Sequence, residues 1–208
     1  MRGQDVRTPV DDVLGAVANL GRSAADWHEA RPEVVLDGSV ASAIDALHLV
    51  NFSLWHCEDW ARRKELPDTD IARAKRSIDA LNARRNLLME RVDELLLALI
   101  PAHEPDDRVA EQFETPGMLI DRLSIMALRL FHTGRATGMA ERLQVLETQQ
   151  RDLAAVLEAL LRDLFAGRRT LKLYRQFKVA TYAPWDCGLW REAGPFATDA
   201  LTASTPPD

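Results

Sequence analysis

The sequence predicts an all-α protein, a single-domain bundle of about five long helices. Apolar residues recur at steps of three and four over long stretches. Capping residues and prolines stand where those stretches begin and end, and no alternating run rich in valine and isoleucine predicts a strand. The chain has 208 residues, of which 47% are hydrophobic and 28% charged, a composition typical of folded globular proteins. Because no linker divides the sequence, we expect one domain over residues 1–208.

The first two helices are predicted on either side of a turn at residues 37–39. Apolar residues at helical spacing place the first from about Asp11 to Ala30. The second is expected from Val40 to about Lys64, with Ser39 as its N-cap. Residues 1–10 lack this periodicity, so we expect a frayed N-terminus.

Three more helices are predicted from similar signals. The third begins near Asp68 or Asp70 and ends at Ile100, before a proline. The fourth, opened by Thr115 and Pro116, carries residues 119–132, and the fifth runs from about residue 139 to 166. A basic segment over residues 168–179 is expected as a short helix or an extension, and residues 192–208 as a frayed end.

Charge and composition exclude several classes of function. The net charge is −6, with acidic and basic residues interspersed, so we expect no nucleic-acid partner. No apolar run approaches the roughly 18 residues of a membrane span, and no secretion signal opens the chain. With two cysteines at an unrelated spacing, the chain fits a reducing cytosol. Phosphate-binding, hydrolase-elbow and zinc-protease motifs are absent from the sequence.

The second helix carries polar residues where full burial is expected. Residues 47–57 contain no charged side chain, and their apolar residues surround the helix, which predicts a central position. At 100° per residue one stripe nevertheless collects polar groups. It consists of His48, Asn51, Asp59 and Arg62 together with Trp55, and is bordered by His56 and Glu58. Since buried polar groups require partners, the stripe is either a functional site or a hydrogen-bond network that fixes helix register.

The functional interpretation centres on His56 and Asp59. Residues three apart on a helix project side by side, so these two can share a proton or ligate a metal ion. Proton transfer is the preferred role, with His132 of the fourth helix as a further candidate metal ligand. His48 lies about 12 Å further along the helix and cannot reach the same ion. The cofactor is not determined by the sequence.

His48 and Glu58 are further catalytic candidates, and Asn51, Trp55 and Arg62 of the stripe are candidates for substrate binding. Polar residues elsewhere in the chain are also candidates for substrate binding. Asp79, Asn82 and Asn86 follow one side of the third helix, and Asp121 occurs on the fourth. Tyr174 and Lys178 belong to a small polar cluster near the end of the chain. We interpret the remaining histidines and the cysteines, His28, His103, Cys57 and Cys187, as structural or incidental.

Four segments resemble a bacterial family known as domain of unknown function 4254. They are Leu54–Arg62, Lys75–Asn86, Ile120–Ile125 with His132, and Tyr174–Lys178, and together they span most of residues 45–180. The resemblance supports the helical fold and picks out much the same residues as the spacing does. These are His48, Asn51, Trp55, His56, Glu58, Asp59, Arg62, Asp79, Asn82, Asn86, Asp121, Arg122, Ser124, Tyr174, Gln176 and Lys178.

The resemblance implies no reaction. The chain departs from the family pattern at Cys57 and Leu87, where acidic residues are usual, and at residues 179–181. Two functions of different classes are therefore open. One is an enzyme that acts on a small polar metabolite, and the other is a non-catalytic binding or scaffold protein for a biosynthetic partner. A homo-oligomer is compatible with both functions.

Overall fold

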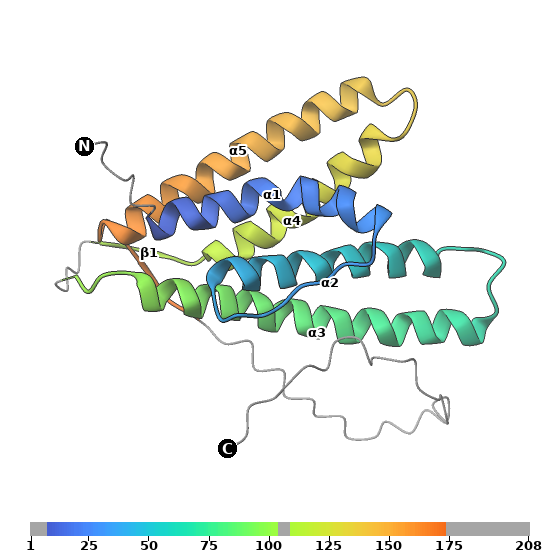
Figure 1. Cartoon of the computed structure of the whole chain (residues 1–208), viewed down its shortest axis with the longest axis horizontal. Helices are drawn as coiled ribbons and strands as arrows, with labels where there is room; N and C mark the ends of the chain where they lie inside the picture. The colour runs from blue at the N-terminus through green and yellow to red at the C-terminus, as the bar shows by residue number, and fades with distance from the viewer. Residues whose placement is uncertain (1–7, 104–108, 174–208) are drawn as a thin grey trace, which may run out of the picture.

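The computed structural model describes residues 8–103 and 109–173, which form five helices and two short strands (Figure 1). The all-α bundle predicted from the sequence is confirmed. The predicted frayed ends at residues 1–7 and 192–208 lie outside the described residues. In the part of the chain that is described, no helix is long and apolar enough to cross a membrane.

Helix α1 (Pro9–Glu29) begins two residues before the predicted start. The Thr8 side chain accepts a hydrogen bond from the Asp11 backbone N–H, and the Asp11 carboxylate accepts one from the Thr8 N–H. Proline at the first helical position lacks a donor that would be unsatisfied there anyway. The prediction that residues 8–10 fray is therefore wrong, because this capping box holds them in the helix.

The other helices begin close to their predicted starts. Helix α2 (Val40–Ala61) is capped by Ser39, and α4 (Pro116–Gly134) by Thr115. Helix α3 (Asp68–Leu99) has no side-chain cap at its start. Helix α5 (Ala140–Phe165) is followed by Gly167, whose φ of +69° is the left-handed conformation expected after a helix end.

Two three-residue strands, β1 (Ala110–Gln112) and β2 (Arg169–Leu171), form a parallel pair at one end of the bundle. The sequence predicts no strand here and a helix or extension over the second segment. That prediction is wrong for these residues. Three residues are too few to show an alternating pattern, and the pairing brings together segments that are remote in the sequence.

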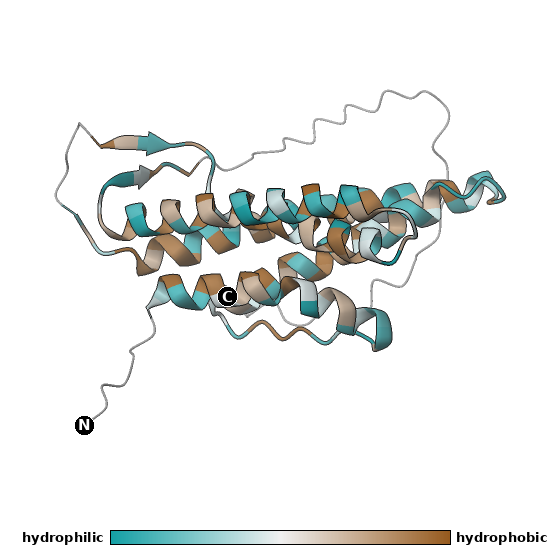
Figure 2. Cartoon of the chain, turned by 90° about the horizontal axis from the view of Figure 1, so that it is seen from above, coloured by the Kyte–Doolittle hydropathy of each residue, from teal (hydrophilic) through white to brown (hydrophobic). Residues whose placement is uncertain are grey.

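Helices α1, α2 and α4 run in the same direction, with their C-terminal ends toward the same end of the bundle (Figure 1). A long connection over residues 30–39 returns the chain along the bundle and makes this arrangement possible. All five helices contribute to one hydrophobic core, and hydrophobic and hydrophilic residues alternate around each helix (Figure 2).

Helix α2 lies against α1, α3 and α4, as its apolar sequence predicts. Full burial nevertheless ends at Leu54. Trp55, His56 and Cys57 are only half-buried, because α1 and α4 end beside this part of α2. The expectation that the whole stretch over residues 47–57 is buried is therefore wrong for its last turn.

The start of α4 is held tightly against α3. The backbone N–H of Gly117 donates to the Asp93 carboxylate at 2.7 Å. Burial raises the pKa of this carboxyl to about 6, and hydrogen bonds from Thr115 and Gly117 oppose the increase. A negative charge at a helix N-terminus is favourable, so Asp93 fixes where α4 begins.

Candidate functional site

Three histidines meet where the parallel helices end. His28 is in the last turn of α1 and His132 in the last turn of α4, while His56 faces them from α2. One ligand nitrogen from each ring lies within 4.8 Å of the other two. We call His28, His56 and His132 the histidine cluster. The cluster contains His56 and His132, which are two of the three predicted metal ligands. Its third member is His28, which the sequence analysis interprets as structural or incidental.

Aromatic rings surround the cluster. Trp55 stacks on His132 with ring centroids 4.9 Å apart and planes 4° from parallel. Phe131 stacks on His28 at 4.2 Å, and Phe52 meets His56 edge to face at 4.6 Å. Each imidazole of the cluster is therefore packed against at least one aromatic ring.

The outer nitrogens of the cluster have no hydrogen-bond partner within the described residues. The Nε2 atoms of His28, His56 and His132 are all buried and unpaired, and so is the indole Nε1 of Trp55. By contrast, His28 Nδ1 lies 2.6 Å from the carbonyl oxygen of Ala24. Because a carbonyl only accepts, Nδ1 carries the proton in neutral His28 and Nε2 bears the lone pair.

Burial lowers the pKa of both His56 and His132. The neighbouring cluster histidines lower it further, since like charges would repel, while the negative charge of Asp59 opposes the shift. Both rings are therefore neutral at pH 7. Neutral imidazoles can accept a proton or ligate a metal ion.

The charged residues expected beside His56 are more exposed. Asp59 and Glu58 are both bonded to Arg62, at 3.2 and 3.4 Å. The Asp59 side chain is 57% exposed and does not belong to the group whose ligand atoms converge. In the group whose ligand atoms converge, the neighbours of His56 are His28 and His132, and the predicted partner Asp59 is not a member.

The other half of the polar stripe is a closed hydrogen-bond network. His48 Nε2–H donates to the Leu20 carbonyl at 2.9 Å, which leaves Nδ1 to accept the Ser124 hydroxyl at 2.8 Å. The Asn51 amide donates to Ser124 and to Asp121, at 3.0 and 2.9 Å. The network ends on Arg85.

Arg85 reaches Asp121 with two nitrogens, and its Nε donates at 2.7 Å. Asp121 is 4% exposed and His48 is 0% exposed. A substrate cannot reach groups that are covered and already paired. The arrangement therefore favours the structural interpretation for His48, Asn51 and Asp121, and separates them from the histidine cluster.

The His48 network makes stability depend on pH. Burial lowers the pKa of His48 to about 4 from an ordinary 6.5, against an opposing hydrogen bond to Leu20. Between these values the unfolded chain binds the proton more tightly than the folded protein. The contribution of His48 is complete above pH 6.5 and is lost as the pH falls toward 4, by about 3 kcal/mol in total.

We expect His48→Gln to remove this part of the acid sensitivity, because glutamine does not titrate. Urea unfolding of the parent and the variant should be measured between pH 4.5 and 8. The free energy of unfolding of the variant should be lower at pH 8 by about 1–3 kcal/mol, because glutamine does not reproduce both hydrogen bonds of His48. This difference between parent and variant should become smaller as the pH falls. Parallel stability curves would contradict the pKa assignment.

The remaining predicted substrate residues are dispersed. Asp79 is exposed and paired with Lys75, while Asn82 and Asn86 are half-buried on α3. Asn86 lines a small cavity beside Asp93. Tyr174 and Lys178 lie outside the described residues. Among the described residues, Asp79, Asn82 and Asn86 make no hydrogen bond, ion pair or ring contact with the histidine cluster.

Comparison with known proteins places the chain in a family. The family model described as "Protein of unknown function (DUF4254)" matches residues 41–173. The chain belongs to this family. No curated protein and no solved structure matches the chain.

The DUF4254 match confirms the resemblance seen in the sequence. It includes His56 and His132 but begins after His28. The histidine cluster thus combines two residues of the DUF4254 segment with one from the helix that precedes it.

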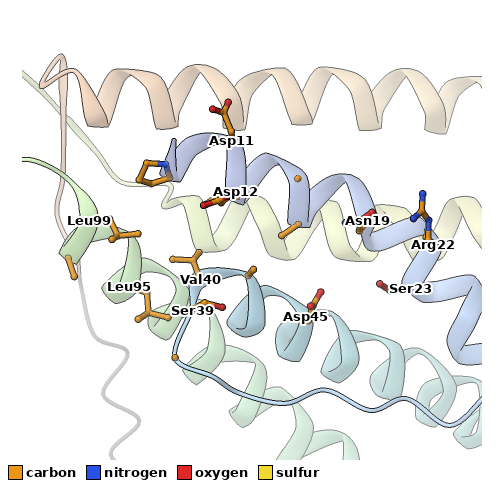
Figure 3. A pocket seen from close by; sticks show the side chains of 17 residues that line it. Asp11, Asp12, Asn19, Arg22, Ser23, Ser39, Val40, Asp45, Leu95 and Leu99 are labelled. Carbon is orange, nitrogen blue, oxygen red and sulfur yellow. The ribbon is translucent and has the colours of Figure 1, made fainter. Parts of the chain in front are cut away.

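A larger groove lies toward the other end of α1 (Figure 3). It encloses about 1120 Å³ between α1, α2 and α3, and Asp12 and Asp45 are among its lining residues. Burial raises the pKa of Asp45, which is half-buried there. No residue predicted as a site residue lines this groove, and it shares no residue with the histidine cluster. We favour the cluster as the functional site because its unpaired nitrogens converge.

His28 is the member of the histidine cluster that the sequence interpretation missed. One signal was present, since His28 follows Leu20 and Ala24 at steps of four on the buried face of α1. That spacing indicates that the ring points inward. It does not indicate which residues of other helices it meets.

Proposed function

We propose that this DUF4254 member is a cytosolic enzyme that acts on a small polar metabolite at the histidine cluster, with His56 as the central catalytic residue. One observation carries the proposal: three half-buried histidines each bring a ring nitrogen within 4.8 Å of the other two, and the buried Nε2 atom of each has no hydrogen-bond partner among the described residues. Leaving polar atoms unpaired costs free energy, roughly 1–3 kcal/mol for each. Such a cost is common where a ligand completes the pairing.

Neighbouring residues suit a polar ligand. The Trp55 indole N–H is unpaired and can donate to it, and Arg62 carries positive charge at the exposed end of α2. A neutral His56 can accept a proton from a hydroxyl or ammonium group. Asp59 then stabilises the imidazolium that forms, because its negative charge raises the pKa of His56 from the next turn of the same helix.

The proposal can be tested by replacing His56 with glutamine in the full-length protein. Native mass spectrometry and a thermal-shift screen of small polar metabolites identify ligands of the parent. His56→Gln should abolish the ligand-induced shift and keep the parent's melting temperature within a few degrees, because the ring is only half-buried. His103→Gln, at an exposed histidine outside the cluster, should behave like the parent.

The opposite result would reject the site. If His56→Gln melts far below the parent and still responds to the same metabolite, His56 is a packing residue. Incubation with a metabolite extract separates the enzyme from the non-catalytic binding protein. An enzyme depletes one compound and forms another, whereas a binding protein only retains its ligand.

A further inference from the structure

We infer that His28, His56 and His132 form a binding site for a divalent transition-metal ion, and that zinc is the ion their chemistry fits best. The inference deepens the proposed function and rests on it in taking the same three imidazoles as the working centre. When the ion is bound, His56 acts at this centre as a metal ligand and not as the proton acceptor.

The first argument is the state of the ligand atoms. Imidazole nitrogen is a common ligand of zinc, copper, nickel and iron. All three Nε2 atoms are buried and lack a hydrogen-bond partner among the described residues. In a bundle that pairs even His48 at both ring nitrogens, three unpaired imidazole nitrogens in neighbouring side chains are best explained by a cation that they bind.

The second argument is how His28 is oriented. Its Nδ1–H donates to the Ala24 carbonyl at 2.6 Å, within the same helix. A metal-bound histidine almost always donates its other N–H to a carbonyl, carboxylate or water, which fixes the tautomer and the ring orientation. The hydrogen bond to Ala24 therefore fixes the orientation of the His28 ring and leaves Nε2 to bind the ion.

The third argument is distance. In a tetrahedral zinc site with Zn–N bonds of about 2.0–2.1 Å, the ligand nitrogens lie roughly 3.3 Å apart. The nitrogens of the cluster are within 4.8 Å of one another. Closing the site thus requires each pair to approach by at most about 1.5 Å relative to that geometry. Side-chain rotations on three adjacent helices can supply this movement without a change of fold.

The fourth argument is electrostatic. His28 and His132 lie in the last turns of α1 and α4, where unpaired carbonyl groups give a helix its negative end. Asp59, which is also paired with Arg62, adds negative charge on the neighbouring turn of α2 and favours positive charge on His56 and His132. A cation at the cluster is stabilised by all three. Aromatic rings on the other sides exclude water and strengthen these interactions.

Three protein ligands leave one tetrahedral position open. Structural zinc sites use four protein ligands, whereas catalytic sites use three and bind water or substrate in the fourth position. The site would then be of the catalytic kind.

The test is metal binding by the full-length chain without a histidine tag. After treatment with a chelator, the protein is titrated with Zn²⁺ by calorimetry and with Co²⁺, whose visible absorption reports tetrahedral coordination. We expect one ion per chain and a rise in melting temperature. His28→Gln, His56→Gln and His132→Gln should each weaken binding by at least about 100-fold, whereas His103→Gln should leave it unchanged.

Circular dichroism identifies any variant that fails to fold, and the other two then carry the test. The inference is overturned if the parent does not bind a stoichiometric ion. It is also overturned if the folded cluster variants bind as tightly as the parent. If the protein responds to a metabolite but binds no stoichiometric ion, the proposed function is retained and the metal site is rejected. If it binds the ion and responds to no metabolite, the metal site is retained and the proposed function is rejected.

Discussion

Replacing Arg85 with methionine is expected to lower the free energy of unfolding by about 3–5 kcal/mol. The reason is Asp121, which is 4% exposed and keeps its charge balanced only through two bonds from Arg85. Without the guanidinium, the protein holds an uncompensated carboxylate in its interior. Urea unfolding at pH 7 measures the loss.

Two further variants show whether the loss of stability arises from the uncompensated carboxylate of Asp121. Adding Asp121→Asn to Arg85→Met should recover at least about 1 kcal/mol, because the amide is neutral and its oxygen still accepts from Asn51. Arg162→Met removes an exposed pair with Glu158 and should cost no more than about 0.5 kcal/mol. If Arg85→Met is as stable as Arg162→Met, the buried pair does not hold α3 to α4.

Gly117→Ala is the second substitution for which a large effect is expected. A Cβ at this position would lie 2.5 Å from the backbone oxygen of Met89 and 2.9 Å from the Asp93 carboxylate. Helix α4 would have to move away from α3 and weaken the hydrogen bond between Gly117 and Asp93. We expect the variant to lose at least about 2 kcal/mol of unfolding free energy.

The matched control is Gly15→Ala in the middle of α1, where a Cβ meets no atom within 4 Å. Alanine is the better helix former, so this variant should gain about 0.5–1 kcal/mol. Opposite signs for the two alanines would show that close helix contact, and not glycine itself, decides the outcome. A loss at Gly15 equal to that at Gly117 would contradict this explanation.

Most of the fold could be predicted because helix ends are local features. Ser39 and Thr115 mark the starts of α2 and α4 correctly, since a capping side chain bonds within three residues of itself. The start of α1 was placed too late because Thr8 and Pro9 precede the apolar pattern. The two strands could not be predicted at all, because each is defined by a partner nearly 60 residues away.

The candidate site could be predicted only in part. Helical spacing correctly grouped His48, Asn51 and His56 near one side of α2. It could not show that His48 and Asn51 are buried in a hydrogen-bond network whereas His56 is only half-buried. That difference depends on where α1 and α4 stop. His48 meets Ser124 and Leu20 inside the bundle, whereas His56 lies beside the last turns of both neighbours.

The sequence by itself determined the helices, their apolar faces and the presence of histidines on those faces. These properties follow from side chains within one or two turns of each other, so their periodicity is visible in the chain. Only the tertiary structure decided that His28 joins His56 and His132. Helices α1 and α4 must end beside His56 of α2 for these rings to meet, and that depends on packing and on the long connection over residues 30–39. The spacing of residues along one helix contains no information about the level at which another helix ends.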